Sequence, residues 1–182
     1  MKKYNIAADI HLHGVHEITG LNLLTPDENF ILLGDIVDLS GCRKKDKHKA
    51  KLTKDVLLST HGDNYITGNH DLGFKNKWVI KDKVLFTHGD YVFWSRDKAN
   101  KYRKKNSGRS WFGRCLIWLG EHVRGSYSSW KTKDLISASI IAKSFDCHTI
   151  IVGHKHPNRV LDIKFQGVRC ICVPRGITPI LI

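Results

Sequence analysis

Five short blocks of this chain carry side chains of the kinds that bind metal ions. The blocks are Asp9-Ile10-His11, Gly34-Asp35-Ile36-Val37-Asp38, Gly68-Asn69-His70-Asp71, Thr87-His88-Gly89-Asp90 and Gly153-His154-Lys155-His156. Carboxylates, imidazoles and amide oxygens are ligands that Mn, Fe, Zn and Ni accept, and no block contains a cysteine that would favour a soft thiolate site. Two cations about 3.5–4 Å apart need one bridging carboxylate and about three further protein ligands each. The side chains that supply this number are Asp9, His11, Asp35, Asn69, His88, His154 and His156.

Phosphate-ester hydrolysis is the chemistry that such a pair of ions supports. The ions lower the pKa of bound water to about 7, which makes a bridging hydroxide available, and they clamp the phosphoryl oxygens during in-line attack. Any one block has a simpler explanation, because Asp-x-His and Gly-His pairs are common in turns. Five blocks within 182 residues are much harder to assign to chance.

Each block directly follows a short apolar run. The runs are Tyr4-Asn5-Ile6-Ala7-Ala8, Phe30-Ile31-Leu32-Leu33, Tyr65-Ile66-Thr67, Val84-Leu85-Phe86-Thr87 and Thr149-Ile150-Ile151-Val152. Such β-branched and aromatic runs without polar alternation predict strands that are buried on both faces. In open α/β sheets the ligand crevice lies at the carboxyl ends of the strands, so we expect the blocks to converge at one edge. Their glycines permit tight turns and close backbone approach.

The chain length favours a single α/β domain over residues 1–182, with too few residues for two ordinary domains. Strands are expected near 3–9, 29–34, 64–67, 84–88, 148–153 and 177–182, with a hairpin over 158–174 that turns at Gln166-Gly167. A helix is expected near 46–60, a helix or loop near 14–25, and a helical insert or lid over about 91–145.

The five blocks resemble the calcineurin-like metallophosphoesterase family, whose pattern is D-x-H, G-D-x-x-D, G-N-H-[DE], a histidine often followed by glycine, and G-H-x-H. The resemblance runs from Asp9 to His156. It implies a four-layer α-β-β-α sandwich of two mixed β-sheets flanked by helices, here with a basic helical insert. It also implies two divalent metal ions, for which Mn²⁺ is our first expectation and Fe, Zn and Ni would also fit.

The same resemblance implies a role for each matching residue. Asp9, His11 and His156 would hold the first metal. Asp35 would bridge, and Asn69, His88 and His154 would hold the second metal. His70 would neutralise the transition state or protonate the leaving oxygen, and Asp71 would orient His70. A helix cap and a supporting contact to the site both remain open for Asp38.

Positive charge is concentrated in two segments that follow metal-binding blocks. Residues 43–54 have a net charge of +6 and residues 91–133 a net charge of +9, which leaves −2 for the rest of a chain with +13 in total. Such segments attract an anion larger than a lone phosphate, although solvated helix faces are the alternative. The candidate substrate-binding residues are Asn69, His13, Arg43, Arg103 and Arg109, although the position of His13 is more typical of a surface loop histidine.

The 91–133 segment also contains the apolar run Trp111–Leu119. This run could be the core helix of a lid, an interfacial helix at a membrane, or a stacking surface for bases. An apolar, arginine-rich insert at this place resembles the lid of UDP-diacylglucosamine pyrophosphohydrolases. This chain is shorter than those enzymes, and the basic 43–54 segment has no place in their pattern.

Three functions are therefore expected in this order. The first is a binuclear metal-dependent phosphoesterase that acts on a nucleotide-containing or nucleic-acid substrate. The second is a pyrophosphohydrolase of a lipid-linked nucleotide sugar, in peripheral contact with a membrane through the insert. The third is a non-catalytic binding module, against which the complete ligand set argues. No apolar run is long enough to span a membrane, and five cysteines without zinc-like pairing suit the cytoplasm.

Overall fold

The computed structural model describes residues 1–12, 21, 23–24, 27–39, 44–71, 76–95, 97–101 and 129–182. Most of the segment 14–25 and the centre of the expected insert lie outside these ranges, as do the candidate substrate residues His13, Arg43, Arg103 and Arg109. Within the ranges that are described, no helix is both long enough and apolar enough to cross a bilayer.

The first sheet has four strands in the order β3-β2-β1-β9. They are β3 (Tyr65–Ile66), β2 (Phe30–Leu33), β1 (Lys3–Ala8) and β9 (Gly176–Leu181). Strands β1, β2 and β3 are parallel, whereas β9 runs antiparallel to β1, so the sheet is mixed. Helix α2 (Lys47–His61) covers one face of this sheet, and short 3₁₀ turns flank the helix at Lys44–Asp46 and Gly62–Asn64.

The second sheet has five strands in the order β4-β5-β6-β8-β7. They are β4 (Trp78–Lys81), β5 (Val84–Thr87), β6 (Thr149–Val152), β8 (Val168–Cys172) and β7 (Leu161–Phe165). The three central strands are parallel and the two edge strands are antiparallel to their neighbours, so this sheet is also mixed. Helices α3 (Asp90–Phe93) and α6 (Thr132–Ser144) lie on its outer face.

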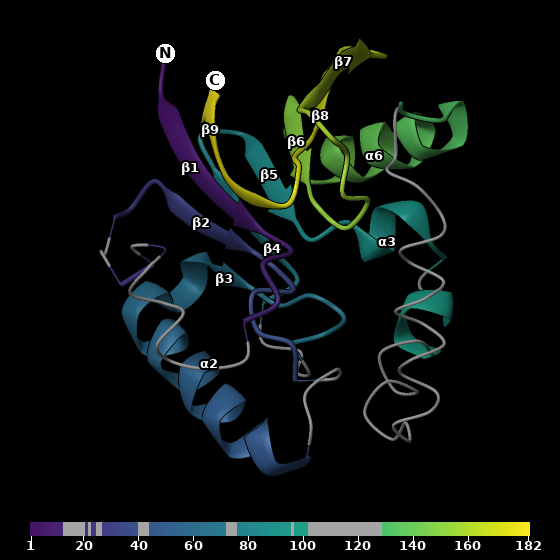
Figure 1. The fold of residues 1–182 in the computed structure, drawn as a ribbon. Coiled ribbons are helices and arrows are strands. Elements are labelled where there is room, and N and C mark those ends of the chain that lie inside the picture. Colours follow the sequence, from purple (N-terminus) through teal and green to yellow (C-terminus); the bar gives the residue numbers. More distant parts are fainter. Residues whose placement is uncertain are drawn as a thin grey trace.

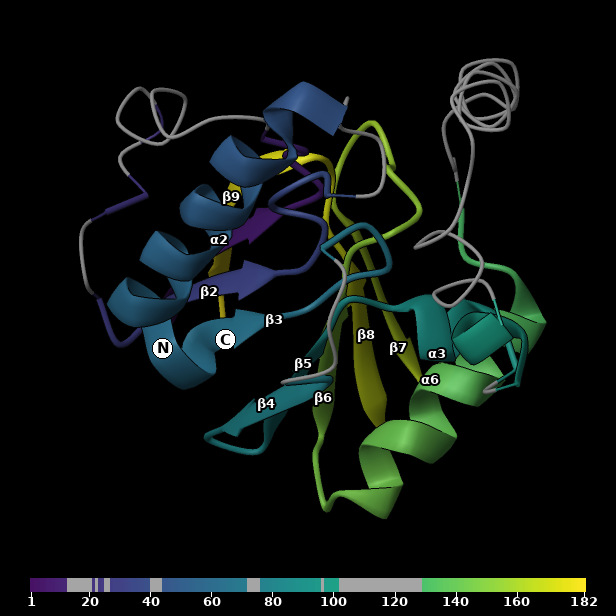
Figure 2. The same cartoon turned by 90° about the horizontal axis from the view of Figure 1, so that it is seen from below.

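Three apolar clusters hold the layers together. Ala50 and Leu57 of α2 pack against the outer face of the first sheet, where Leu32 is buried. Between the sheets, Ile31 and Phe86 are among the buried residues that face each other. The third cluster joins α6 to the outer face of the second sheet. Helix, sheet, sheet and helix therefore follow one another across the molecule (Figure 1), which confirms the four-layer sandwich, and Figure 2 shows the same layers from below.

The fold also contains a strand that we did not expect. Strand β4 lies at the edge of the second sheet, and its residues alternate between exposed and partly buried. Asp82 and Lys83 form the turn that joins β4 to β5, and both have left-handed backbone conformations, with φ of 48° and 59°. The turn lacks the glycine that usually identifies such a hairpin in a sequence. The expected turn at Gln166-Gly167 is confirmed, and it joins β7 to β8.

Candidate metal centre

The predicted ligands converge where β1, β2, β3, β5 and β6 end. They form two groups that we name by their exposure. The outer group consists of Asp9, His11 and His156, and the inner group consists of Asp35, Asn69, His88 and His154. The structure therefore brings together residues that are as much as 147 positions apart in the sequence.

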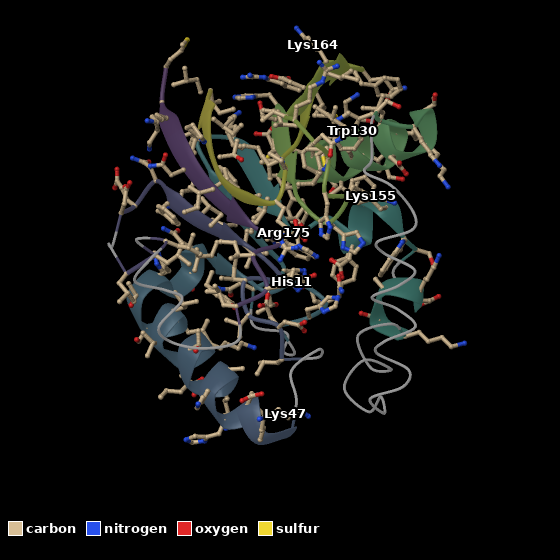
Figure 3. The ribbon with its side chains drawn as sticks, viewed as in Figure 1. His11, Lys47, Trp130, Lys155, Lys164 and Arg175 are labelled. Atoms are coloured by element: carbon tan, nitrogen blue, oxygen red, sulfur yellow. The ribbon has the colours of Figure 1, made fainter. Side chains whose placement is uncertain are left out.

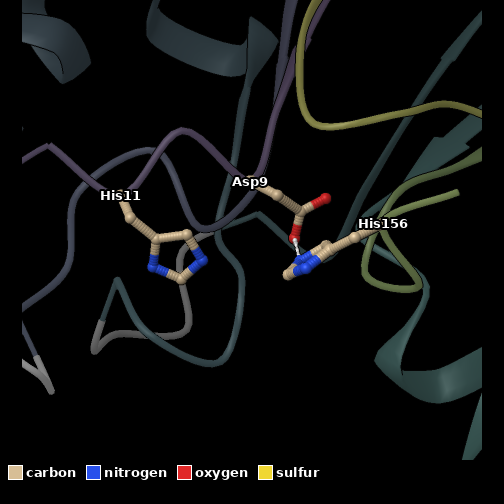
Figure 4. A group of neighbouring side chains, drawn as sticks. All are labelled: Asp9, His11 and His156. Carbon is tan, nitrogen blue, oxygen red and sulfur yellow. Dashed lines mark hydrogen bonds and ion pairs between the residues drawn. The ribbon is translucent and has the colours of Figure 1, made fainter. Parts of the chain in front are cut away.

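The outer group has its ligand atoms within 4.8 Å of one another. Asp9 is fully buried, and its Oδ1 lies 3.0 Å from Nε2 of His156. Figure 4 shows the Asp9 carboxylate against the His156 ring, with the His11 ring to one side of the pair. Burial lowers the pKa of His11 to about 4, so this ring is neutral and offers a lone pair to an ion. The His156 side chain is 40% exposed, so this end of the centre is open to solvent.

The inner group surrounds Nε2 of His88. This nitrogen lies 3.2 Å from Oδ2 of Asp35, 3.1 Å from Oδ1 of Asn69 and 3.1 Å from Nδ1 of His154. Two ligands that bind one ion at about 2.1 Å lie about 3.0–3.4 Å apart when their bonds meet at tetrahedral or octahedral angles. The spacing and the oxygen and nitrogen donors therefore fit a shared divalent cation.

The protonation of the inner histidines also fits an ion. Nδ1 of His88 donates to the carbonyl oxygen of Leu33 at 3.1 Å, and because a carbonyl only accepts, the bond fixes this tautomer and points Nε2 at the other ligands. Burial disfavours charge on His88, but attraction to Asp35 outweighs it and raises the pKa to about 10. A metal cation bound beside Asp35 would be attracted by the same carboxylate. Burial and the neighbouring His88 lower the pKa of His154 to about 3, so His154 is neutral.

Five of the seven predicted ligands have a left-handed backbone conformation. They are Asp9, His11, Asp35, His154 and His156, with φ between 44° and 69°. Such a conformation costs about 1–3 kcal/mol for a residue other than glycine, and it persists only where the surrounding structure imposes it. The fold therefore holds these backbones in place at the expense of local stability.

Glycines beside the ligands leave no room for a side chain. A Cβ on Gly34 would lie 2.7 Å from Cγ of His88, and one on Gly153 would lie 2.7 Å from Oδ2 of Asp9. A Cβ on Gly68 would lie only 2.1 Å from Oδ1 of Asp35. Close approach of backbone to ligand is therefore the physical reason for glycine at these three positions.

His70 lies beside both metal groups. Its backbone N–H donates to Oδ1 of Asp35 at 2.6 Å, and its ring lies 4.7 Å from the ring of His11. Nδ1 of His70 lies 3.2 Å from Oδ1 of Asp38, a residue for which we left a helix cap and a supporting contact open. The geometry favours the supporting contact, because Asp38 orients the His70 ring and would stabilise its charged form.

Asp71 does not have the contact that we expected. One of its oxygens accepts from the backbone N–H groups of Asp35 and Gly68, and the other accepts from Val37 N–H and from the Tyr65 hydroxyl, at 2.7–3.0 Å. Both oxygens are thus engaged away from the His70 ring, whose partner is Asp38. Asp71 thus bonds to the two loops that present Asp35 and Asn69, and we propose that it positions the inner group in place of the expected orientation of His70.

Asp71→Asn should weaken metal binding without removing any ligand. The amide NH₂ would face a backbone N–H, which leaves buried donors without an acceptor and costs about 1–3 kcal/mol of stability. Supporting residues of this kind change metal affinity by about 10–100-fold. Titration calorimetry with Mn²⁺ and urea unfolding would measure both effects. Wild-type Mn²⁺ affinity in the variant would contradict the positioning role.

Lys54 is a residue of the centre that we did not identify from the sequence. We counted it with the basic segment 43–54, yet it is buried, and its Nζ donates to the backbone oxygen of Asp71 at 2.7 Å. Helical periodicity could have identified it in the sequence, because Lys54 shares the buried face of α2 with Ala50, Leu57 and His61. This contact ties the helix to the loop behind the inner group.

Comparison with known proteins places the chain in a family. A family model described as calcineurin-like phosphoesterase matches residues 3–158, a range that contains all five blocks. No curated protein matches the chain. The structure of a cold-active protein tyrosine phosphatase has 16% sequence identity and a TM-score of 0.41, covering 93% of this chain and 69% of its own. The cold-active protein-tyrosine phosphatase of the psychrophile Shewanella sp. has 18% identity and a TM-score of 0.45, covering 95% and 71%.

Proposed function

Since the chain belongs to the calcineurin-like phosphoesterase family and is therefore a metal-dependent phosphoric ester hydrolase, we propose that its substrate contains a nucleotide, either within a nucleic acid or as a smaller nucleotide ester. The charge of the basic segment 91–133 and the contacts of its two described ends carry this proposal. The ring of Trp94 lies edge-on to His154 at 4.6 Å, and Phe93 stacks on the same histidine at 6.1 Å. Trp130, near the end of the basic segment, packs on Phe93 at 5.7 Å.

One described end of the basic segment thus contacts the inner-group ligand His154, and the other end packs on the first. Between Trp94 and Trp130 the segment contains nine Lys or Arg residues and two acidic residues. Positive charge next to a phosphate site raises the local concentration of anionic substrates and speeds their association. A lone phosphate would need little of this charge, whereas a nucleotide or a nucleic acid carries further anionic groups and bases that can stack on aromatic rings.

In this proposal the outer group holds one ion and the inner group holds the other, with Asp35 between them. Asp35 suits the bridging role because its charge acts on Asp9, His11, His88, His154 and His156. We propose Mn²⁺ as the first candidate, and the oxygen and nitrogen donors would also accept Fe, Zn or Ni. When bound, the two ions supply the Lewis acidity that activates water and neutralises phosphoryl charge. His70, held by Asp38, would donate a proton to the leaving oxygen.

His70→Ala should retain the metals and lose about 10²–10⁴-fold in kcat if the imidazole transfers a proton. The loss should be smaller for nitrophenyl esters, whose leaving group needs no proton. The measurement is kcat for alkyl and nitrophenyl esters of phosphate at saturating Mn²⁺, with exposed His48→Ala as the control. An equal loss for both kinds of ester would show that His70 contributes electrostatics or position instead.

A substrate panel tests the proposed function. It compares nitrophenyl phosphate, nucleotide mono- and diesters, nucleotide pyrophosphates and short RNA and DNA, each with Mn²⁺ and with a chelator. We expect chelator-sensitive hydrolysis that is fastest for a nucleotide-containing compound. Hydrolysis of nitrophenyl phosphate with none of the nucleotide compounds cleaved would refute the substrate proposal. Hydrolysis confined to a lipid-linked nucleotide sugar on anionic vesicles would support the second expected function.

Variants of the insert extend the panel. Changing Arg103 and Arg109 to Gln should raise KM for the preferred nucleotide substrate and leave nitrophenyl phosphate unaffected. For a nucleic acid, removing an arginine that binds a phosphate should also reduce the salt slope by about 0.7–0.9. Exposed Lys164→Gln on β7 removes the same kind of charge at a distance from the site and serves as the control.

A further inference from the structure

Arg175 lies at the open end of the metal centre. Its Nη2 donates to the carbonyl oxygen of Ile10 at 3.1 Å, and Ile10 stands between the outer-group residues Asp9 and His11. Figure 3 shows Arg175 beside His11, whereas the labelled Lys164 lies at the far end of the second sheet. The guanidinium is thus held against the backbone that presents two of the three outer ligands.

The sheet register explains this position. Strand β9 runs antiparallel to β1, and its first residue, Gly176, pairs with Ala8 at the end of β1. The residue before Gly176 must therefore reach the point where β1 gives way to Asp9. Gly176 has φ of 107°, a conformation that favours glycine and lets the chain turn into β9 beside the centre. Arg175 lies beyond residue 158, where the family match ends.

Most of the hydrogen-bond donors of the Arg175 guanidinium have no acceptor among the described residues. Across the part of the chain that the structure describes, its guanidinium makes only the one bond to Ile10 and is exposed. Arg169 provides the contrast, since Asp162 occupies its Nε and Nη2 and the carbonyl of Leu181 accepts from its Nη1. A guanidinium presents several N–H donors in a planar fork that matches phosphate oxygens. Arg175 therefore retains the donors that phosphate binding requires.

The outer group, beside which Arg175 lies, is open to solvent at His156. The His156 side chain is 40% exposed, whereas in the inner group His154 is partly exposed and the side chains of His88 and Asp35 are 1% and 3% exposed. A substrate whose reacting phosphate sits between the two groups can extend past the exposed outer group. An anionic group in a part that extends this way would meet Arg175.

We propose that Arg175 is a specificity-determining residue that binds a second phosphate of the substrate, next to the phosphate that is hydrolysed. This inference rests on the proposed function, because it requires a phosphate substrate at the metal centre. It narrows the substrate class to nucleotide compounds with two neighbouring phosphates. The bond to Ile10 orients the guanidinium before the substrate arrives, which reduces the entropy that binding must overcome.

The test compares two non-hydrolysable ligands by titration calorimetry on the Mn²⁺-loaded protein. Methylphosphonate has one anionic group and methylenediphosphonate has two. Wild type should bind the diphosphonate more tightly, and Arg175→Gln should weaken that binding by about 10–100-fold, the range for hydrogen bonds between charged groups. Methylphosphonate binding should change by less than about twofold, because it reaches only the metals. Arg175→Lys should retain part of the preference, since it keeps the charge and loses the fork.

Arg169→Gln is the matched control, because it removes an arginine that lies far from the centre. Arg169 is on β8 opposite Thr149, the first residue of β6, whereas His154 follows the other end of β6. This control variant should leave the affinity for both ligands unchanged. The proposal is overturned if wild type has no preference for the diphosphonate, or if Arg175→Gln weakens both ligands equally. A weaker affinity for Mn²⁺ itself in Arg175→Gln would also overturn it, since Arg175 would then only support the Ile10 backbone. The proposed function fails on a different result, the absence of Mn²⁺-dependent hydrolysis in wild type.

Discussion

Asp35→Asn should reduce turnover by more than about 10³-fold while the fold remains intact. Asp35 is 2% exposed, and its carboxylate contacts both His88 and the backbone of His70. The amide keeps the size of the side chain but removes the negative charge on which two cations would depend. Removing a single preorganised hydrogen-bond donor from an active site already costs about 10²–10³-fold in kcat, and here the change would affect both ions.

Metal binding can be measured separately from catalysis in this variant. A ligand that binds only the folded state raises Tm, so Mn²⁺ should raise the Tm of wild type and raise that of Asp35→Asn much less. Asp55→Asn makes the same chemical change at an exposed position of α2 and should behave as wild type. Full activity with both metals bound in Asp35→Asn would contradict the assignment of this carboxylate.

Gly68→Ala should weaken both catalysis and metal binding by adding a single methyl group. The new Cβ would lie 2.4 Å from the backbone nitrogen of Asp35 as well as 2.1 Å from its Oδ1. Because one of these atoms belongs to the backbone, rotation of a side chain cannot relieve the overlap. The loops that present Asp35 and Asn69 must move apart, and a displacement of about 1 Å at a catalytic group can cost about 10²-fold. We expect that loss in kcat/KM, together with weaker Mn²⁺ binding in calorimetry.

Gly167→Ala provides the comparison for this variant. Gly167 lies in the turn between β7 and β8 with φ of 83°, and a Cβ there would meet nothing within 4 Å. Its left-handed conformation should cost about 1–2 kcal/mol of stability, with activity and metal affinity unchanged. If Gly68→Ala resembled Gly167→Ala, losing stability alone, the close approach between Gly68 and Asp35 would have no functional meaning.

The buried strands and the ligand blocks could be predicted from local sequence patterns. Runs such as Phe30–Leu33 and Thr149–Val152 are apolar without alternation, and all four residues of each are buried. A buried strand can be recognised within its own few residues, because a strand buried on both faces needs apolar residues at successive positions. The ligand types are local too, since each block follows its own strand. The hairpin turn at Gln166-Gly167 was predictable for the same reason.

The tertiary structure decided which residues support the ligands. Asp71 neighbours His70 in the sequence, yet its oxygens accept from the backbone of Asp35 and Val37, and Asp38 is the residue that reaches the His70 ring. Lys54 belongs by composition to a basic segment and by position to the buried face of α2. Contacts of this kind depend on how two loops and a helix pack, which a pattern within one segment does not record.

Strand order and register also produced features that the sequence patterns did not predict. Strand β4 pairs only at the edge of its sheet, so its residues carry a weak apolar signal, and Asp82-Lys83 turns without a glycine. Arg175 reaches Ile10 because β9 pairs antiparallel with β1 across more than 160 residues of sequence. A strand can be recognised from the types and spacing of neighbouring side chains. The pairing of β9 with β1 depends instead on the free energy of the whole packed sandwich. The assembled sheets therefore determine which distant residues meet.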